Sequence, residues 1–195
     1  MTIFEEIQAA YRASQETYRD YARASLAAAQ DLAHRFREYL GAPETYTDPE
    51  DETRRPYVRL LAFQLQDGTP VAAQPESQAD ILAREDDGFW RFAISLTVDR
   101  DSESFPKQQL AFFLRLKLQG GVRHVQLLDE GFQDFQIAET GGPDERALFD
   151  HMVEMLKRLM RAKPWEGVEK LPIGFELHPP KPALDDDNPA LLEAP

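Results

Sequence analysis

The chain has 195 residues, no cysteine, 42% hydrophobic residues and a formal net charge of −13 at pH 7. This length and apolar content predict one folded domain with appended segments, and they exclude a wholly disordered chain. The lack of cysteine excludes disulfides, thiolate metal sites and cysteine nucleophiles. The acidic balance argues against partners such as nucleic acid or an anionic membrane, because both require clusters of Lys and Arg.

The first six residues include two glutamates where a signal peptide needs basic side chains, and no apolar run approaches the roughly 18 residues of a membrane span. These features predict a cytoplasmic protein. Its acidity leaves basic proteins as candidate partners.

Residues 2–40 contain neither proline nor glycine and are rich in Ala, Glu, Gln, Arg and Leu, which all favour helices. Gly41 and Pro43 then supply a stop signal. The pattern predicts one long amphipathic helix within residues 1–43, about 57 Å in length at 1.5 Å per residue.

The apolar positions of this helix recur in alternating steps of three and four, which predicts one buried face. The second half, from Ala22 to Leu40, carries a broad stripe of Ala, Leu and Phe, and we expect it to pack on the protein's own sheet. The first half is rich in tyrosine, which gives a large contact area and tolerates exposure. It therefore predicts a partner-binding surface made of Phe4, Ile7, Tyr11, Tyr18 and Tyr21.

Residues 44–56 are acidic and polar, and they predict a linker or exposed loop. The remainder predicts an α+β domain over residues 57–177. Alternating apolar residues and glycine turns indicate an antiparallel β-meander of five or six strands over 57–138. A C-terminal helix over 143–163 is expected to pack on the sheet, and a proline-rich, acidic, disordered tail over 178–195 follows.

Two further surfaces are candidate binding sites. Arg91, Arg115 and Lys117 should project from one polar face of the meander, where they can form a patch that binds an anion. The alternative is that acidic groups of the long helix pair with this face. In the acidic tail, Leu191 and Leu192 are candidates for docking on a partner.

No nucleophile, phosphate-loop, dinucleotide or metal-binding motif occurs in the sequence, so it predicts no catalytic residue, cofactor or metal. The favoured hypothesis is a non-enzymatic interaction protein: an adaptor, a chaperone-like protein or an accessory subunit, with an acidic inhibitor of a basic partner as a special case. It would bind another protein or self-associate through the N-terminal helix.

Two other classes of function stay open. One is a small-molecule-binding domain with an apolar cavity between sheet and C-terminal helix, lined by Trp90, Phe92, Phe112, Met152 and Met155. The other is an enzyme with a dispersed site near His151, whose side chain shares a helix face with Glu154.

Overall fold

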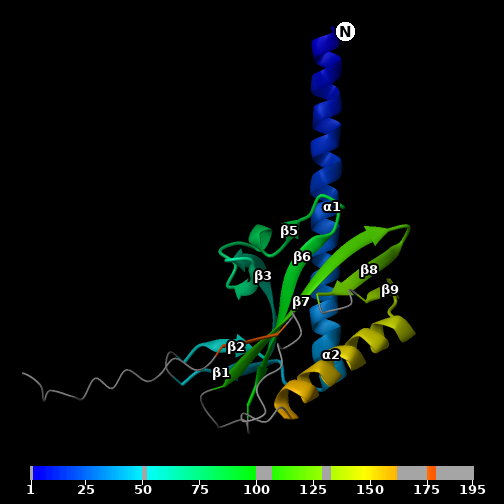
Figure 1. The fold of residues 1–195 in the computed structure, drawn as a ribbon. Helices are drawn as coiled ribbons and strands as arrows, with labels where there is room; N and C mark the ends of the chain where they lie inside the picture. Colours follow the sequence, from blue (N-terminus) through cyan, green and yellow to red (C-terminus); the bar gives the residue numbers. More distant parts are fainter. Residues whose placement is uncertain (1, 50–51, 100–106, 129–132, 162–174, 179–195) are drawn as a thin grey trace, which may run out of the picture.

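The computed structural model of the chain describes residues 2–49, 52–99, 107–128, 133–161 and 175–178. Figure 1 shows one long helix that runs past a twisted sheet and projects beyond it, with a second helix near the other end of the sheet. The elements in chain order are α1 (Ile3–Leu40), β1 (Thr45–Thr47), β2 (Arg54–Pro56), β3 (Val58–Gln66), β4 (Thr69–Ala73), a 3-10 turn η1 (Gln78–Asp80), β5 (Ala83–Arg84), β6 (Trp90–Val98), β7 (Gln108–Gln119), β8 (Val122–Leu127), β9 (Asp134–Ala138), α2 (Pro143–Arg161) and β10 (Phe175–His178).

Local signals fix both ends of α1. The Thr2 hydroxyl accepts from the Glu5 backbone N–H at 3.3 Å, and the Glu5 carboxylate accepts from the Thr2 N–H at 2.6 Å. This capping box satisfies two amides that the first helical turn leaves without partners. At the other end Gly41 adopts the left-handed conformation (φ 63°), which costs glycine little. The predicted helix is therefore confirmed almost to the residue.

The sheet has eight strands, of which six follow the order β4-β3-β6-β7-β8-β9 and pair in antiparallel fashion. Two tight turns connect its hairpins: Asp67 and Gly68 between β3 and β4, and Gly120 and Gly121 between β7 and β8. All four residues have positive φ, as two-residue hairpin turns require. The α+β meander is confirmed, and the short strands β5 and β10 add to it by pairing with β6 and β7.

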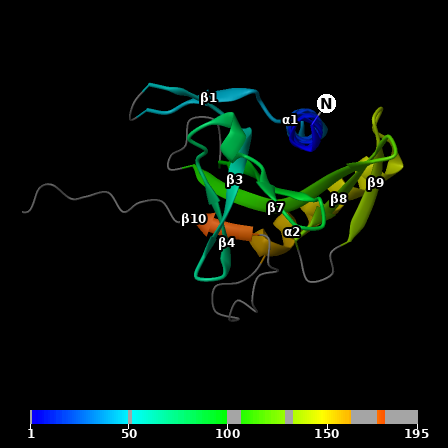
Figure 2. The ribbon, with the colours of Figure 1, turned by 90° about the horizontal axis from the view of Figure 1, so that it is seen from above.

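Both helices contribute to the main hydrophobic core, together with alternate residues of the central strands. In the view from above, α1 is seen end-on beside the sheet (Figure 2). Phe36 of α1 lies at the centre of this core: its ring is 5.6 Å from that of Phe112 and 5.3 Å from that of Phe149 in α2. The buried residues of α1 are Ser25, Ala28, Ala29, Leu32, Ala33 and Phe36. Small side chains at four of these six positions allow the helix to approach the strands closely.

A smaller cluster forms from the other set of alternating strand residues. Phe63 and Phe113 meet edge to face at 5.8 Å, together with Leu61, Ala93 and Ala111. The two clusters show that the central strands are buried on both faces.

Residues 44–56 differ from the expected linker, because they contain the β1–β2 hairpin. Tyr46 packs against Tyr57 with ring centroids 5.1 Å apart, and an ion pair joins Arg55 to Asp48 at 3.2 Å. The ammonium of Lys107 lies 5.2 Å from the centre of the Tyr46 ring. Contacts with residues distant in the sequence therefore order a segment whose composition is typical of loops.

Candidate interaction surface

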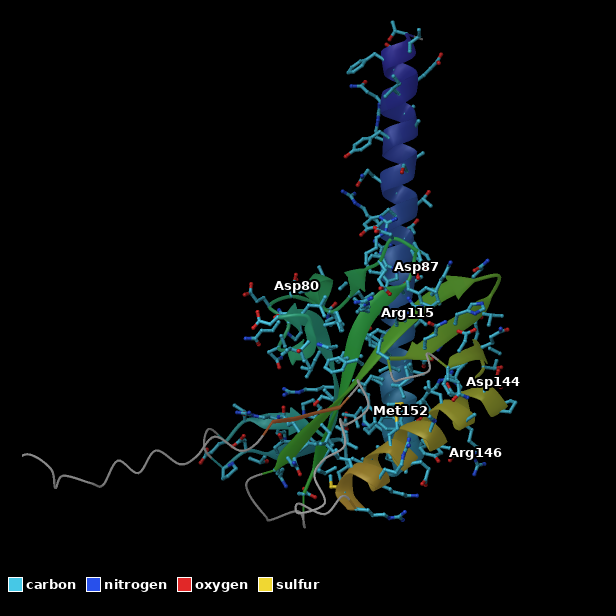
Figure 3. The ribbon with its side chains drawn as sticks, viewed as in Figure 1. Asp80, Asp87, Arg115, Asp144, Arg146 and Met152 are labelled. Atoms are coloured by element: carbon cyan, nitrogen blue, oxygen red, sulfur yellow. The ribbon has the colours of Figure 1, made fainter. Side chains whose placement is uncertain are left out.

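The first part of α1 extends beyond the rest of the described structure. Every residue from Thr2 to Ser14 is exposed, and we call residues 2–14 the projecting segment. Figure 3 shows its side chains standing above the sheet, with no other element beside them. The Cα atoms of a helical segment of this length span roughly 18 Å at 1.5 Å per residue.

Large apolar side chains on this segment are exposed to an unusual degree. The exposed fractions are 77% for Ile3, 66% for Phe4, 60% for Ile7 and 65% for Tyr11. The helical spacing of these residues places them along one side of α1, because residues three and four positions apart share a face. An exposed, contiguous apolar stripe of this kind marks a contact surface more often than scattered apolar residues do.

The charged residues of the same stretch lie on the other side of the helix. Successive residues of a helix are rotated by about 100° about its axis. In this projection, all charged residues between Ile3 and Asp20 lie on the side of the helix opposite the apolar stripe. These charged residues are Glu5, Glu6, Arg12, Glu16, Arg19 and Asp20. The positions that flank the stripe carry no charge.

Two tyrosines fix the point at which α1 meets the domain. The Tyr21 hydroxyl donates to the Gly88 carbonyl at 3.0 Å and accepts from the Leu118 backbone N–H at 3.3 Å. The ring centroids of Tyr18 and Tyr21 lie 5.9 and 6.2 Å from that of Trp90. The Arg84 guanidinium lies 4.9 Å above the centre of the Tyr18 ring.

These contacts correct the expected boundary within the helix. The sequence placed the start of the packed half at Ala22, whereas the structure packs Tyr18 and Tyr21 against the domain's own Trp90. Only Phe4, Ile7 and Tyr11 of the five predicted helix residues lie on the projecting segment. Ile3 was not among the predicted residues, although its place on the apolar side of the helix could have identified it.

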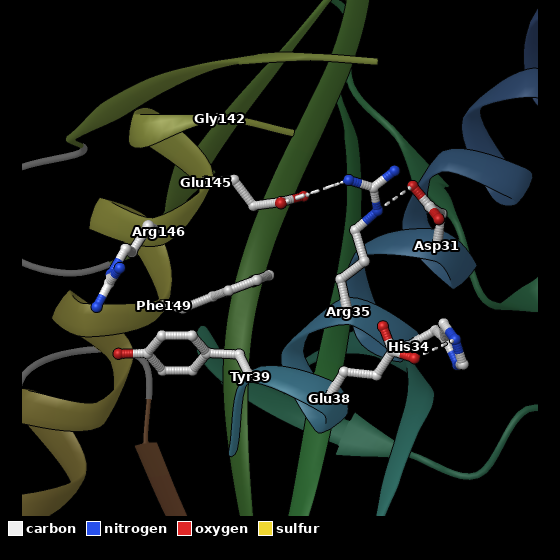
Figure 4. A pocket seen from close by; sticks show the side chains of 9 residues that line it. All are labelled: Asp31, His34, Arg35, Glu38, Tyr39, Gly142, Glu145, Arg146 and Phe149. Carbon is white, nitrogen blue, oxygen red and sulfur yellow. Dashed lines mark hydrogen bonds and ion pairs between the residues drawn. The ribbon is translucent and has the colours of Figure 1, made fainter. Parts of the chain in front are cut away.

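Lower on α1, ion pairs connect the helix to α2 (Figure 4) and, through Arg123, to β8. Arg35 lies between two acids, with Nε 3.1 Å from the Asp31 carboxylate and an NH1 contact of 3.4 Å to Glu145. Arg123 contacts the same Asp31 carboxylate at 2.5 Å. Burial alone would raise the pKa of Asp31, but hydrogen bonds from Arg123 and Arg35 outweigh it and lower this pKa below its ordinary value of 3.8.

The hollow in Figure 4 is lined in part by this network and by Tyr39, whose hydroxyl bonds to Asp150. That hydrogen bond raises the pKa of Tyr39. Within the hollow, Arg35 pairs with both Asp31 and Glu145. Its contacts hold α1 and α2 together, and residues so far apart in sequence give no local signal of this pairing.

The predicted anion patch lies close to acidic groups of the same domain. Arg91 and Arg115 face each other across β6 and β7, and both form ion pairs with Glu85. Arg115 also contacts Asp87 at 3.1 Å, while Lys117 donates to the Asp87 carbonyl at the same distance. Arg123 lies on the opposite face of the sheet, beside Leu118, which packs against the main core, and there it contacts Asp31 of α1.

The residues predicted to line a small-molecule cavity all belong to the packed interior. Trp90, Phe92, Phe112, Met152 and Met155 are buried to at least 95%. Four of them belong to the main core, which the two helices and the sheet share.

His151 is half-buried on α2, with its ring 6.3 Å from that of Phe135. In the described ranges there is no group of three or more His, Asp or Glu side chains that could hold a metal ion. No described helix is both long and apolar enough to cross a membrane. Leu191 and Leu192 lie outside the described residues.

Comparisons of the chain with protein-family models, with curated proteins and with solved structures give no significant match.

Proposed function

We propose that the chain is a non-enzymatic protein-interaction protein whose binding element is the projecting segment of α1. The observation that carries this proposal is the stripe of Ile3, Phe4, Ile7 and Tyr11, each at least 60% exposed. The α+β domain then acts as the base that holds the segment in position.

The energetics of a projecting helix support a binding role. A helix of about 12–15 residues is marginal in water on its own, because nucleation is costly and tertiary packing supplies most helix stability. The capping box at Thr2 and the anchor at Tyr21 support the two ends, but the stripe between them remains solvated. Burial of that stripe against another protein would recover its hydrophobic free energy.

The anchor also suits the proposed role. The Tyr21 hydrogen bonds and the Tyr18 contact with Trp90 fix the direction in which the segment leaves the domain. A binding element held in one orientation loses less conformational entropy on association than a flexible one.

The test compares two variants of the full chain in cells that naturally produce it. In the first, Phe4, Ile7 and Tyr11 are all replaced by Ser. In the control, Arg12→Gln and Glu16→Gln alter the charged side of the same helix. The proposal predicts that chemical cross-linking captures a defined protein, a second copy included, with the natural chain and the control but not with the triple variant.

A natural chain that forms no cross-linked species, or a triple variant that forms the same species in the same amount, would contradict the proposal. Circular dichroism and thermal unfolding of each variant check that the domain itself remains folded. Because the three stripe residues are exposed, their replacement is expected to leave the domain core unchanged.

A further inference from the structure

We infer that the occupant of the stripe is a second copy of this chain, with the two projecting segments packed against each other in antiparallel orientation. This inference rests on the proposed function, since it names the partner of the same surface. Four features of the segment support it: its heptad spacing, its fit to itself, its uncharged flanks and the position of the anchor.

The spacing allows regular packing between two helices. Phe4, Ile7, Tyr11 and Ser14 follow one another at steps of three, four and three, as do the core positions of a two-helix coiled coil. In an antiparallel pair, alternate core positions of the two helices meet at the same level. Here this pairing places Phe4 against the partner's Ser14 and Ile7 against the partner's Tyr11. The two-fold symmetry of the dimer produces each of these contacts twice.

The sizes of the paired side chains are complementary. The ring of Phe4 lies opposite the small side chain of Ser14. Ile7 and Tyr11 form the two central layers of the contact. Alternation of large and small residues across an interface is what close packing requires. A two-fold symmetric contact of a surface with itself is also the commonest arrangement among homo-oligomers.

The flanks of the stripe suit a contact between identical surfaces. Two copies of a charged flank would repel each other, whereas the residues beside the core positions Phe4, Ile7, Tyr11 and Ser14 carry no charge: they are Ile3, Gln8, Ala10, Gln15 and Thr17. The charges lie on the outer side of each helix, where they remain in water.

The anchor excludes a parallel arrangement. The same side of α1 that carries the stripe packs from Tyr18 onward against Trp90 of the chain's own sheet. A parallel partner helix would run into this sheet, and its own domain would collide with the first. In the antiparallel register the partner helix ends at the level of Gln15, just before the Tyr18 and Tyr21 contacts with the domain. The stretch over which the two helices pack therefore matches the length of the projecting segment.

The available area is sufficient for a weak but specific contact. With roughly 200 Å² for each large side chain, the four exposed residues present about 500 Å² per copy, so their complete burial in the pair would reach the approximately 1,000 Å² at which specific interfaces begin. We therefore expect a weak dimer, whose Kd is in the micromolar range and which dissociates on dilution below that concentration.

The experiment is sedimentation equilibrium of the full chain over a concentration range of about 1–200 μM, where mass action shifts a weak dimer. The expected limit at high concentration is twice the chain mass of 22.3 kDa. Ile7→Glu should weaken dimerisation by at least about a hundredfold, because each dimer would bury two unpaired carboxylates. Ala9→Glu is the matched control: it adds the same charge on the opposite, exposed side and should leave the dimer intact.

Orientation is tested by disulfide trapping, since the chain has no cysteine of its own. Chains with Phe4→Cys and chains with Ser14→Cys are mixed under a glutathione redox buffer. The antiparallel register predicts mainly the mixed disulfide, whereas a preference for disulfides between identical chains would contradict it.

The outcomes separate the inference from the proposed function. A chain that stays monomeric throughout the range, yet whose cross-linking to a different protein is lost on Ile7→Glu, would overturn self-pairing and leave the interaction role standing. A natural chain that stays monomeric and cross-links to nothing would overturn both. Dimerisation that both Ile7→Glu and Ala9→Glu leave unchanged would overturn the assignment of the dimer to this stripe.

Discussion

Replacement of Tyr21 by Phe tests whether the hydroxyl of this residue fixes the start of the projecting segment. The change removes one oxygen and leaves the ring against Trp90. It deletes a hydrogen bond to the Gly88 carbonyl at 3.0 Å and one from the Leu118 N–H at 3.3 Å. Both partners are part-buried and lie in elements far from Tyr21 in the sequence, so the two bonds are tertiary contacts.

The magnitude follows from the number and setting of these bonds. A hydrogen bond contributes about 1 kcal/mol net, and partial access of water to the freed groups lowers the cost of leaving them unpaired. We expect Tyr21→Phe to reduce the free energy of unfolding by about 1–2 kcal/mol. For a domain of this size, such a loss lowers the melting temperature by about 2–8 °C.

Urea unfolding gives the free energy, and amide hydrogen exchange shows where the effect arises. Exchange should accelerate first in α1 on both sides of Tyr21, because local opening there no longer breaks these two bonds. Tyr11→Phe is the control, since it removes a hydroxyl from a residue that is 65% exposed. A Tyr21→Phe loss below about 0.5 kcal/mol, the range of ordinary surface substitutions, would refute the reasoning.

Three further predictions concern the contacts that hold α1 in place. Phe36→Ala should cost about 3–5 kcal/mol in urea unfolding, because it removes a fully buried ring that contacts both sheet and α2; an effect below 1.5 kcal/mol would place the ring outside the core. The pKa of Asp31 is lowered on folding, so its contribution is present above its ordinary value of 3.8 and is lost as the pH falls through the lower folded value. The stability of Asp31→Asn, measured by urea titration at each pH, should therefore depend less on pH below 3.8 than that of the natural chain; parallel pH profiles would contradict this. Gly41→Ala should lower the free energy of unfolding, measured by thermal unfolding, by about 1 kcal/mol. The positive φ alone causes this loss, since no atom lies within 4 Å of the added methyl group. An unchanged free energy would show that the helix end rearranges.

The order of helix, meander and helix was predictable because its signals are local. The lack of Gly and Pro between Thr2 and Leu40, followed by Gly41, specifies α1 through backbone preferences of the residues themselves. Asp67-Gly68 and Gly120-Gly121 likewise specify turns with positive φ. Alternation of apolar residues identifies β6 and β7 because side chains of a strand alternate between its faces.

The candidate surface was predictable only in part. Periodicity identified Phe4, Ile7 and Tyr11 as one face of a helix, since that property depends on neighbouring residues alone. It did not show that Tyr21 meets Gly88, because 67 residues separate the pair. The network of Arg35 with Glu145 joins residues 110 positions apart and left no trace in the sequence pattern.

The sequence by itself determined where the helices and strands of the domain form and which side of α1 is apolar, because each of these depends on residues within one or two turns of one another. Only the tertiary structure decided which part of that apolar side is covered. The sheet reaches α1 at Trp90 and covers it from Tyr18 onward, while Ile3 to Tyr11 remain exposed. It also decided that residues 44–56 form a hairpin and that Glu85 pairs with Arg91 and Arg115. Such contacts depend on how distant segments meet in space, which a local pattern does not encode.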